Sequence, residues 1–276
     1  MAVTVPTLMR DAFRSARGAL LEVPWVRELR RRAYRSQFAA GAPGCFYGVY
    51  ASFAEALQDV PKGRAVGYDQ PAMAAMYRDR MSRVYPADYP VLYWLARCLP
   101  GARRLFDFGG HVGIQYYSYR RYLDHPAGMR WVVCDVPEVV RAGRRIAAEE
   151  ARTDVAFVER LDEASGADIL LAAGSLQYLE ASFFHTALAG LAARPRHVLV
   201  NKLPVHAARQ FVTLQDTGPA CHPYTVFESG PFVSAICALG YELVDRWENA
   251  ELSCRVPFHP DHDVPAYSGF YFRAMG

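Results

Sequence analysis

Lysine is almost absent from this sequence of 276 residues, because only Lys62 and Lys202 occur among the 31 basic residues. The formal net charge is only +3 at pH 7. A domain that binds nucleic acid through its phosphates usually concentrates a much larger positive charge on one face. We therefore expect no nucleic-acid partner.

The sequence also lacks paired cysteines and long apolar runs. Its 6 cysteines form no Cys-x-x-Cys pair and no ligand spacing with histidine, which argues against a zinc site and against a secreted disulfide framework. No run is long enough to cross a bilayer, and the N-terminus lacks the apolar core of a signal peptide. We expect a cytoplasmic protein with reduced thiols, no metal and no membrane partner.

What the sequence does contain is a glycine-rich stretch, Leu105–Gly113, which reads Leu-Phe-Asp-Phe-Gly-Gly-His-Val-Gly. An apolar run followed by three glycines predicts a buried strand that turns sharply into a helix near Ile114. Glycine adopts positive φ at no steric cost and lets the backbone approach a ligand closely, while a helix start offers unpaired N–H groups. This turn is where we expect a cofactor.

A second strand, 131–134, ends at Asp135. This is about the offset at which a carboxylate reaches ribose hydroxyls in doubly wound nucleotide-binding folds. The glycine spacing does not fit the dinucleotide fingerprint Gly-x-Gly-x-x-Gly. The residues expected at the cofactor from these two segments are Asp107, Gly109, Gly110, Gly113 and Asp135.

After Asp135 the sequence alternates strand and helix patterns, which predicts a parallel sheet with its ligand beyond the carboxyl ends of the strands. The residues expected at that edge are Leu161, Asp162, Gly174, Ser175, Gln177, Tyr178 and Asn201. Two final strands, 241–247 and 267–273, are joined by a segment without helical period. Because parallel neighbours need a long crossover, usually a helix, we expect this last pair to be antiparallel.

Asp107, Gly109 and Gly113 resemble motif I of the class I S-adenosylmethionine (SAM) dependent methyltransferases, usually Asp/Glu-x-Gly-x-Gly-x-Gly. His111 stands in place of the middle glycine. The resemblance implies a Rossmann-like fold with a mainly parallel seven-stranded sheet and an antiparallel last strand. It also implies SAM as cofactor, with the loop around its methionine end and Asp135 on its ribose.

Other segments are similar to a narrower bacterial family of methyltransferases from surface-polysaccharide and secondary-metabolite pathways. They include Gly67-Tyr68-Asp69, Gly174 to Leu179, Asn201-Lys202-Leu203-Pro204 and Tyr267 to Phe270. That family is in turn similar to azetidine-2-carboxylate synthases, which cyclise SAM itself. The resemblance covers nearly the entire chain from Phe46.

We expect residues 1–100 to form an N-terminal helical region and residues 101–276 to form the SAM-binding domain. The first region is rich in tyrosine and methionine. It would act as a lid whose rings, such as Tyr68 and Tyr77, face a sulfonium, or it would be a helical layer with an aromatic core. Between Leu8 and Tyr34, the many arginines favour a solvated helical face over a membrane or partner surface.

Methyl transfer requires alignment of the acceptor, exclusion of water and, for some acceptors, a base. The catalytic candidates are Tyr178, Gln177, Asn201 and His111, and His206 and His222 are further histidines expected on the rim. A cyclase would instead need an uncharged SAM amine and a closed aromatic pocket. Three functions stay open: methyl transfer to a small polar molecule, SAM cyclisation and non-catalytic SAM binding. A homodimer also stays open.

Overall fold

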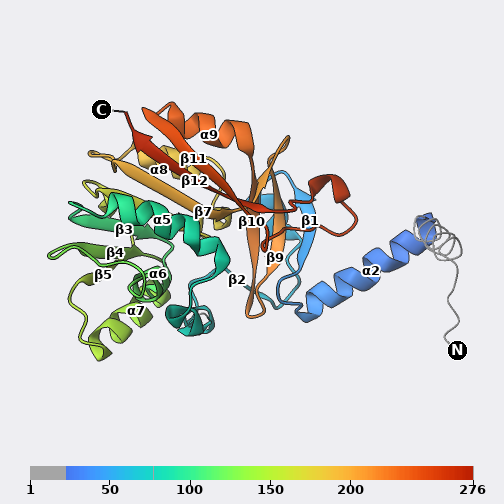
Figure 1. Cartoon of the computed structure of the whole chain (residues 1–276). Helices are drawn as coiled ribbons and strands as arrows, with labels where there is room; N and C mark the ends of the chain where they lie inside the picture. The colour runs from blue at the N-terminus through green and yellow to red at the C-terminus, as the bar shows by residue number, and fades with distance from the viewer. Residues whose placement is uncertain (1–22, 77, 276) are drawn as a thin grey trace, which may run out of the picture.

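The computed structural model describes residues 23–76 and 78–275, and its main feature is a seven-stranded sheet (Figure 1). The strands lie in the order β11 (Tyr241–Asn249), β12 (Tyr267–Ala274), β7 (His197–Leu203), β6 (Ile169–Ala173), β3 (Arg104–Phe108), β4 (Arg130–Cys134) and β5 (Val155–Val158). β12 runs antiparallel to both of its neighbours, while β7, β6, β3, β4 and β5 pair in parallel. The predicted mainly parallel sheet with an antiparallel last strand is confirmed.

The central strands are apolar on both faces because helices cover both faces. Leu105 of β3 packs with residues of α5, α6 and α7, whereas its neighbour Phe106 packs with residues of α8 and α9. The helices are α2 (Pro24–Ala40), α3 (Phe53–Gln58), α4 (Pro71–Ala75), α5 (Tyr89–Cys98), α6 (Ile114–Tyr119), α7 (Pro137–Glu149), α8 (Phe183–Ala189) and α9 (Ser229–Cys237). α7 begins at a proline because that residue lacks the N–H that a first turn leaves unpaired.

A second, smaller sheet stands beside β7 and β12 (Figure 1). It contains β1 (Phe46–Tyr50), β9 (Phe211–Asp216), β10 (Ala220–Glu228) and β2 (Ala65–Val66), and the short β8 (Val205–His206) also pairs with β10. The prediction that residues 1–100 are helical was therefore wrong at β1 and β2. Aromatic and β-branched residues favour a strand at 46–50, but its partner lies far along the chain, at Gln215. The boundary at residue 100 stays a prediction.

α2 extends away from the rest of the molecule (Figure 1), and Phe38 is its buried residue. Its arginines are exposed, as predicted for a solvated face, whereas residues 8–22 of the predicted basic segment lie outside the described residues. Over residues 23–76 and 78–275, no helix combines the length and the apolar character needed to cross a membrane. The same ranges contain no cluster of three metal-ligating side chains.

Candidate functional site

The turn between β3 and α6 requires glycine for separate steric reasons. Gly109 has φ +69°, and a Cβ there would lie 2.2 Å from the Cβ of Ser175. A Cβ at Gly110 would lie 2.4 Å from Oδ2 of Asp107. Gly113 has φ +91°. The backbone of this loop therefore packs directly against the segment that follows β6, which no larger residue would allow.

His111 is part of the loop's framework. Its backbone N–H donates to Oδ2 of Asp135 at 2.9 Å, and its Nε2 lies 3.0 Å from the carbonyl oxygen of Met73. Because a carbonyl can only accept, Nε2 carries the proton and donates it. Burial lowers the pKa of this imidazole to about 4, so the ring is neutral. His111 thus ties the loop to the end of β4 and to α4.

The two predicted carboxylates differ in position. Asp135, at the end of β4, accepts hydrogen bonds from the backbone N–H groups of His111 and Val136. Burial raises the pKa of Asp135 to about 6, although these two hydrogen bonds lower it. Asp107 is fully buried behind Gly110, where Oδ2 accepts a hydrogen bond from Trp131 at 3.0 Å. Among the residues that the structure describes, its Oδ1 has no hydrogen-bond partner, and burial raises the pKa of Asp107 to about 7.

A cavity of about 650 Å³ opens over the carboxyl ends of β3, β4 and β6. Eight of the predicted site residues line it: Tyr68, Gly109, His111, Asp135, Gly174, Ser175, Gln177 and Tyr178. The turn that carries Tyr68 is held in place because Asp69 accepts a hydrogen bond from the backbone N–H of Glu138 in α7. The sheet edge and the Tyr68 turn, which are far apart in sequence, therefore meet at one cavity.

Other predicted residues do not line this cavity. Asp107, Gly110 and Gly113 support the loop from behind, Leu161 packs on the core, and Asp162 is exposed and paired with Arg160. From the end of β5 the cavity instead receives Glu159. The predicted lid residue Tyr77 lies outside the described residues.

Asn201 is also absent from the lining, and it does not end its strand as predicted, because β7 continues to Leu203. Its side chain is fully buried and its Nδ2 donates to the carbonyl of Ala87 at 2.8 Å. Its Oδ1 accepts hydrogen bonds from Trp247 and Asn249, both at 3.0 Å. With these three hydrogen bonds the Asn201 amide joins β7 to β11 and to the turn before α5. Asn201 therefore holds the fold together and does not face the cavity.

A polar group forms one end of the cavity around Asp88. Lys202 Nζ and the hydroxyl of Tyr119 contact its Oδ1 at 2.7 and 3.0 Å, and the N–H of Tyr85 donates to its Oδ2. Lys202 has φ +55°, which is uncommon for a residue with a side chain. The sequence offered one signal for this pair, because Lys202 is one of only two lysines.

The second sheet supplies a wall that the sequence reasoning missed. We call the part of the cavity lined by Phe46, Tyr68, Tyr178, His222, Tyr224 and Tyr267 the aromatic chamber. The centroid of the Tyr68 ring lies 4.4 Å from the centroid of the His222 ring and 4.7 Å from that of the Tyr178 ring. Tyr178 also donates from its hydroxyl to Oε1 of Gln215 at 2.8 Å. Tyr178 therefore joins the edge of the main sheet to the second sheet.

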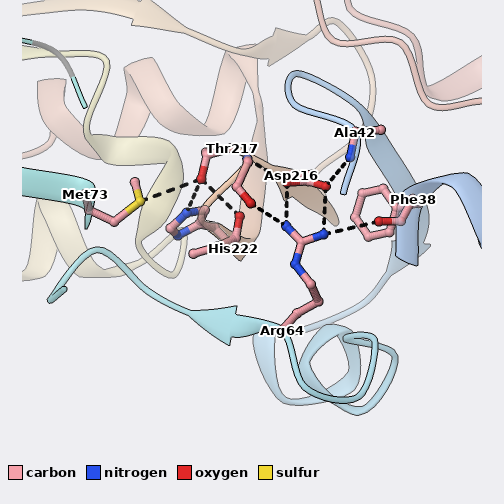
Figure 2. Close-up of polar contacts among 9 residues, drawn as sticks. Phe38, Ala42, Arg64, Met73, Asp216, Thr217 and His222 are labelled. Atoms are coloured by element: carbon pink, nitrogen blue, oxygen red, sulfur yellow. Dashed lines mark hydrogen bonds and ion pairs between the residues drawn. The ribbon is translucent and has the colours of Figure 1, made fainter. Parts of the chain in front are cut away.

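Figure 2 shows how the turn before His222 is held. The Nε2 atom of His222 lies 2.9 Å from Oγ1 of Thr217, and that hydroxyl is 3.0 Å from the carbonyl oxygen of Ala220. The neighbouring Asp216 is fully buried and pairs with Arg64 at 2.7 Å. A buried, well-bonded pair of this kind fixes the β9–β10 hairpin, and with it the position of the imidazole.

No family model and no curated protein matches this sequence. Among solved structures, a 1,6-didemethyltoxoflavin-N1-methyltransferase from Burkholderia thailandensis is similar, with 18% identity, 69% of this chain and 79% of that chain covered, and a TM-score of 0.47. An O-methyltransferase family protein from the same organism has 16% identity and a TM-score of 0.49, and the match spans 74% of this chain and 60% of that one. A methyltransferase from Streptomyces caelestis has 16% identity and a TM-score of 0.47, with 76% and 98% covered.

The strand order carries the fold assignment by itself. Numbered along the chain, the seven strands of the main sheet lie in the order 3-2-1-4-5-7-6, and only the seventh is antiparallel to its neighbours. This antiparallel insertion is what the dinucleotide-binding Rossmann sheet lacks. The chain therefore has the Rossmann-like fold of the class I methyltransferases.

Proposed function

We propose that this chain is a SAM-dependent enzyme that transfers the methyl group of SAM to a small polar acceptor. The observation that carries the proposal is the convergence of Gly109, Asp135 and Ser175 on one cavity at the carboxyl edge of the sheet. In open α/β sheets this edge is where nucleotide-containing ligands bind. The absence of a Cβ at Gly109 lets the loop backbone pack directly on Ser175, so both residues lie at the same edge of the cavity.

The residues present suit SAM. Each carboxylate oxygen of Asp135 already accepts one backbone N–H, and each keeps a lone pair that can accept a ribose hydroxyl. The loop backbone and the Asp88 group can hold the charged methionine end, and our proposal puts the methyl group beside Gln177 and Tyr178, which line the same cavity. When bound, SAM supplies a methyl group that its sulfonium has already activated.

The chain's own contribution is then to orient the acceptor and to exclude water. We call the side of the cavity that is lined by Gly109, Asp135 and Ser175 the cofactor wall. Tyr178 of the aromatic chamber follows Ser175 closely in the chain, and its hydroxyl is held by Gln215. Gln177 is almost fully buried, and its Oε1 has no hydrogen-bond partner in the structure. A buried carbonyl oxygen without a partner gains from a ligand N–H or O–H group, so Gln177 can orient either the cofactor amine or the acceptor.

SAM cyclisation is the second candidate, and the aromatic chamber favours it. Cyclisation needs the SAM amine in its uncharged form, and a closed apolar environment disfavours the charged form of an amine. The rings of Tyr68, Tyr178 and His222 provide such an environment beside the cofactor wall.

Titration calorimetry with SAM tests the shared part of both proposals, because absence of binding would contradict them together. Incubation with SAM alone then separates them. Methyl transfer predicts no turnover until an acceptor is supplied, followed by S-adenosylhomocysteine. Rapid release of methylthioadenosine without an acceptor would contradict methyl transfer and support cyclisation. Binding of SAM without either product, across an acceptor panel, would favour a non-catalytic binding protein.

A further inference from the structure

The charges that line the cavity lie outside the aromatic chamber. They belong to Asp135 and Glu159 at the strand ends, to Asp88 and Lys202, and to Arg80 and Arg83. The ionisable groups within the chamber are an imidazole and tyrosine hydroxyls. Burial raises the pKa of Tyr224 and of Tyr267 well above the ordinary value, and burial lowers the pKa of His222 to about 4. At neutral pH these three buried side chains carry no charge.

The contacts of Thr217 allow His222 two neutral tautomers. The Thr217 hydroxyl has one proton and lies 3.0 Å from the carbonyl oxygen of Ala220, 3.8 Å from the sulfur of Met73 and 2.9 Å from Nε2 of His222. When that proton is directed to Ala220 or to Met73, Nε2 of His222 donates to Oγ1 of Thr217, and when it is directed to Nε2, the ring proton is on Nδ1. In the first tautomer Nδ1 carries a lone pair, and His222 lines the cavity. This differs from His111, whose Nε2 proton is donated within the cofactor loop.

The rings of the chamber also restrict what shape fits it. Tyr178 meets Tyr68 and Tyr224 edge to face, with ring centroids 4.7 and 5.4 Å apart. Such walls present ring faces and edges to their neighbours, which is the surface on which another flat ring packs well. A charged ligand would lose its hydration there without gaining an opposite charge, and this costs several kcal/mol.

We propose that the aromatic chamber receives the acceptor as an uncharged ring that carries a hydroxyl group, that His222 takes the tautomer whose Nε2 donates to Thr217, and that Nδ1 of His222 accepts a hydrogen bond from that hydroxyl. This proposal rests on the proposed function, because it places the acceptor beside the cofactor wall. Tyr178 connects the aromatic chamber to the cofactor wall. It follows Ser175 in the chain, and Ser175 packs on Gly109. The centroid of the Tyr178 ring lies 5.5 Å from the centroid of the His222 ring. The hydrogen bond orients an oxygen lone pair of the hydroxyl toward the cofactor side.

The test uses the full chain saturated with S-adenosylhomocysteine, and phenol, benzoate and benzylammonium as probes of similar size. Binding is followed by ¹⁵N chemical shifts of histidine side chains. We expect phenol to saturate, to shift the Nδ1 resonance of His222, and to bind at least tenfold more tightly than either charged probe. In His222→Phe, which keeps a ring but has no nitrogen, phenol affinity should fall roughly fivefold, the value of one ordinary hydrogen bond.

His206→Gln is the matched control, because His206 lies outside the cavity lining and accepts a hydrogen bond from Ala208. It should leave phenol affinity unchanged. Thr217→Val should release the Nε2 proton to exchange between the two nitrogens and weaken phenol binding. The proposal is overturned if benzoate binds as well as phenol, if His222→Phe binds phenol normally, or if Nδ1 resonates as a protonated nitrogen. Failure of S-adenosylhomocysteine to bind is a separate result, which would overturn the proposed function instead.

Discussion

The two walls of the cavity hold a ligand by different physical means. The cofactor wall, which contains Gly109, Asp135 and Ser175, offers a tightly packed loop backbone and a carboxylate, and the loop can pack on Ser175 because Gly109 has no side chain. The chamber wall, whose second-sheet residues lie on β1 and β10, is built from large buried rings such as His222 and Tyr224. A wall of the first kind recognises a ligand that brings its own charge and hydroxyl groups, whereas a wall of the second kind selects by shape and by absence of charge.

The largest expected effect breaks the cofactor wall. In Gly109→Ala a Cβ at 2.2 Å from Ser175 must displace backbone, so we expect a loss of about 3 kcal/mol in the free energy of unfolding and a SAM affinity at least tenfold weaker. Gly128→Ala is the control, because Gly128 shares a positive φ (+78°) but a Cβ there has no atom within 4 Å. Urea unfolding of both variants separates the two causes of instability, because Gly128→Ala reports backbone strain alone and Gly109→Ala reports strain together with the collision on Ser175. Equal losses in the two would show that the loop does not pack on Ser175.

The next effect concerns the carboxylate of the same wall. Asp135→Ala should weaken SAM binding by about 1 to 3 kcal/mol through the loss of charge-assisted hydrogen bonds to ribose. Asp162→Ala is its control, since Asp162 is exposed and paired with Arg160 outside the cavity, and it should leave the affinity unchanged. Calorimetry measures both. A weaker SAM affinity in Asp162→Ala than in Asp135→Ala would place the ribose at the end of β5 instead.

The cofactor wall could be predicted because its signals are local. The glycines and Asp107 follow one another within a few residues, and Asp135 ends the next strand, so strand order alone brings them together. The prediction failed for two polar residues that were expected to follow strands at the cavity. Asn201 lies within β7 and is buried in the fold, whereas Asp162 lies in a short helical turn after β5 and is exposed.

The chamber wall could not be predicted in the same way. It depends on pairing between Phe46 and Gln215, which are distant in sequence, and no local pattern specifies such a partner. β10 is buried along most of its length and contains Pro223, so it shows neither the alternation nor the composition of an ordinary strand. His222 was recognised as a rim histidine, but only the contact with Thr217 gives it a defined orientation.

A pH experiment compares the buried acid of the cofactor wall with an exposed one. Burial raises the pKa of Asp107 to about 7, above the unfolded value near 3.8. Between these values the native state keeps a proton that the unfolded state releases, so stability falls as pH rises from about 4 to 7, by up to about 1.4 kcal/mol per pH unit. Asp107→Asn should reduce this slope, to which the raised pKa of Asp135 also contributes below about pH 6, and Asp124→Asn, at an exposed carboxylate, should not. Urea unfolding at several pH values measures it; an unchanged slope in Asp107→Asn would show that Asp107 is ionised in the native state.

The smallest effect tests whether the two walls act together. Tyr178 follows β6 of the main sheet, and its hydroxyl donates to Gln215 of the second sheet at 2.8 Å. A double-mutant cycle of Tyr178→Phe and Gln215→Met should give a coupling of about 0.5 to 1.5 kcal/mol in the free energy of unfolding, the net value of one hydrogen bond. If the bond also positions Tyr178 for both ligands, Tyr178→Phe should weaken phenol binding to the S-adenosylhomocysteine complex about as much as Gln215→Met does. Additive losses in the cycle would show that the hydrogen bond between Tyr178 and Gln215 does not couple the two sheets.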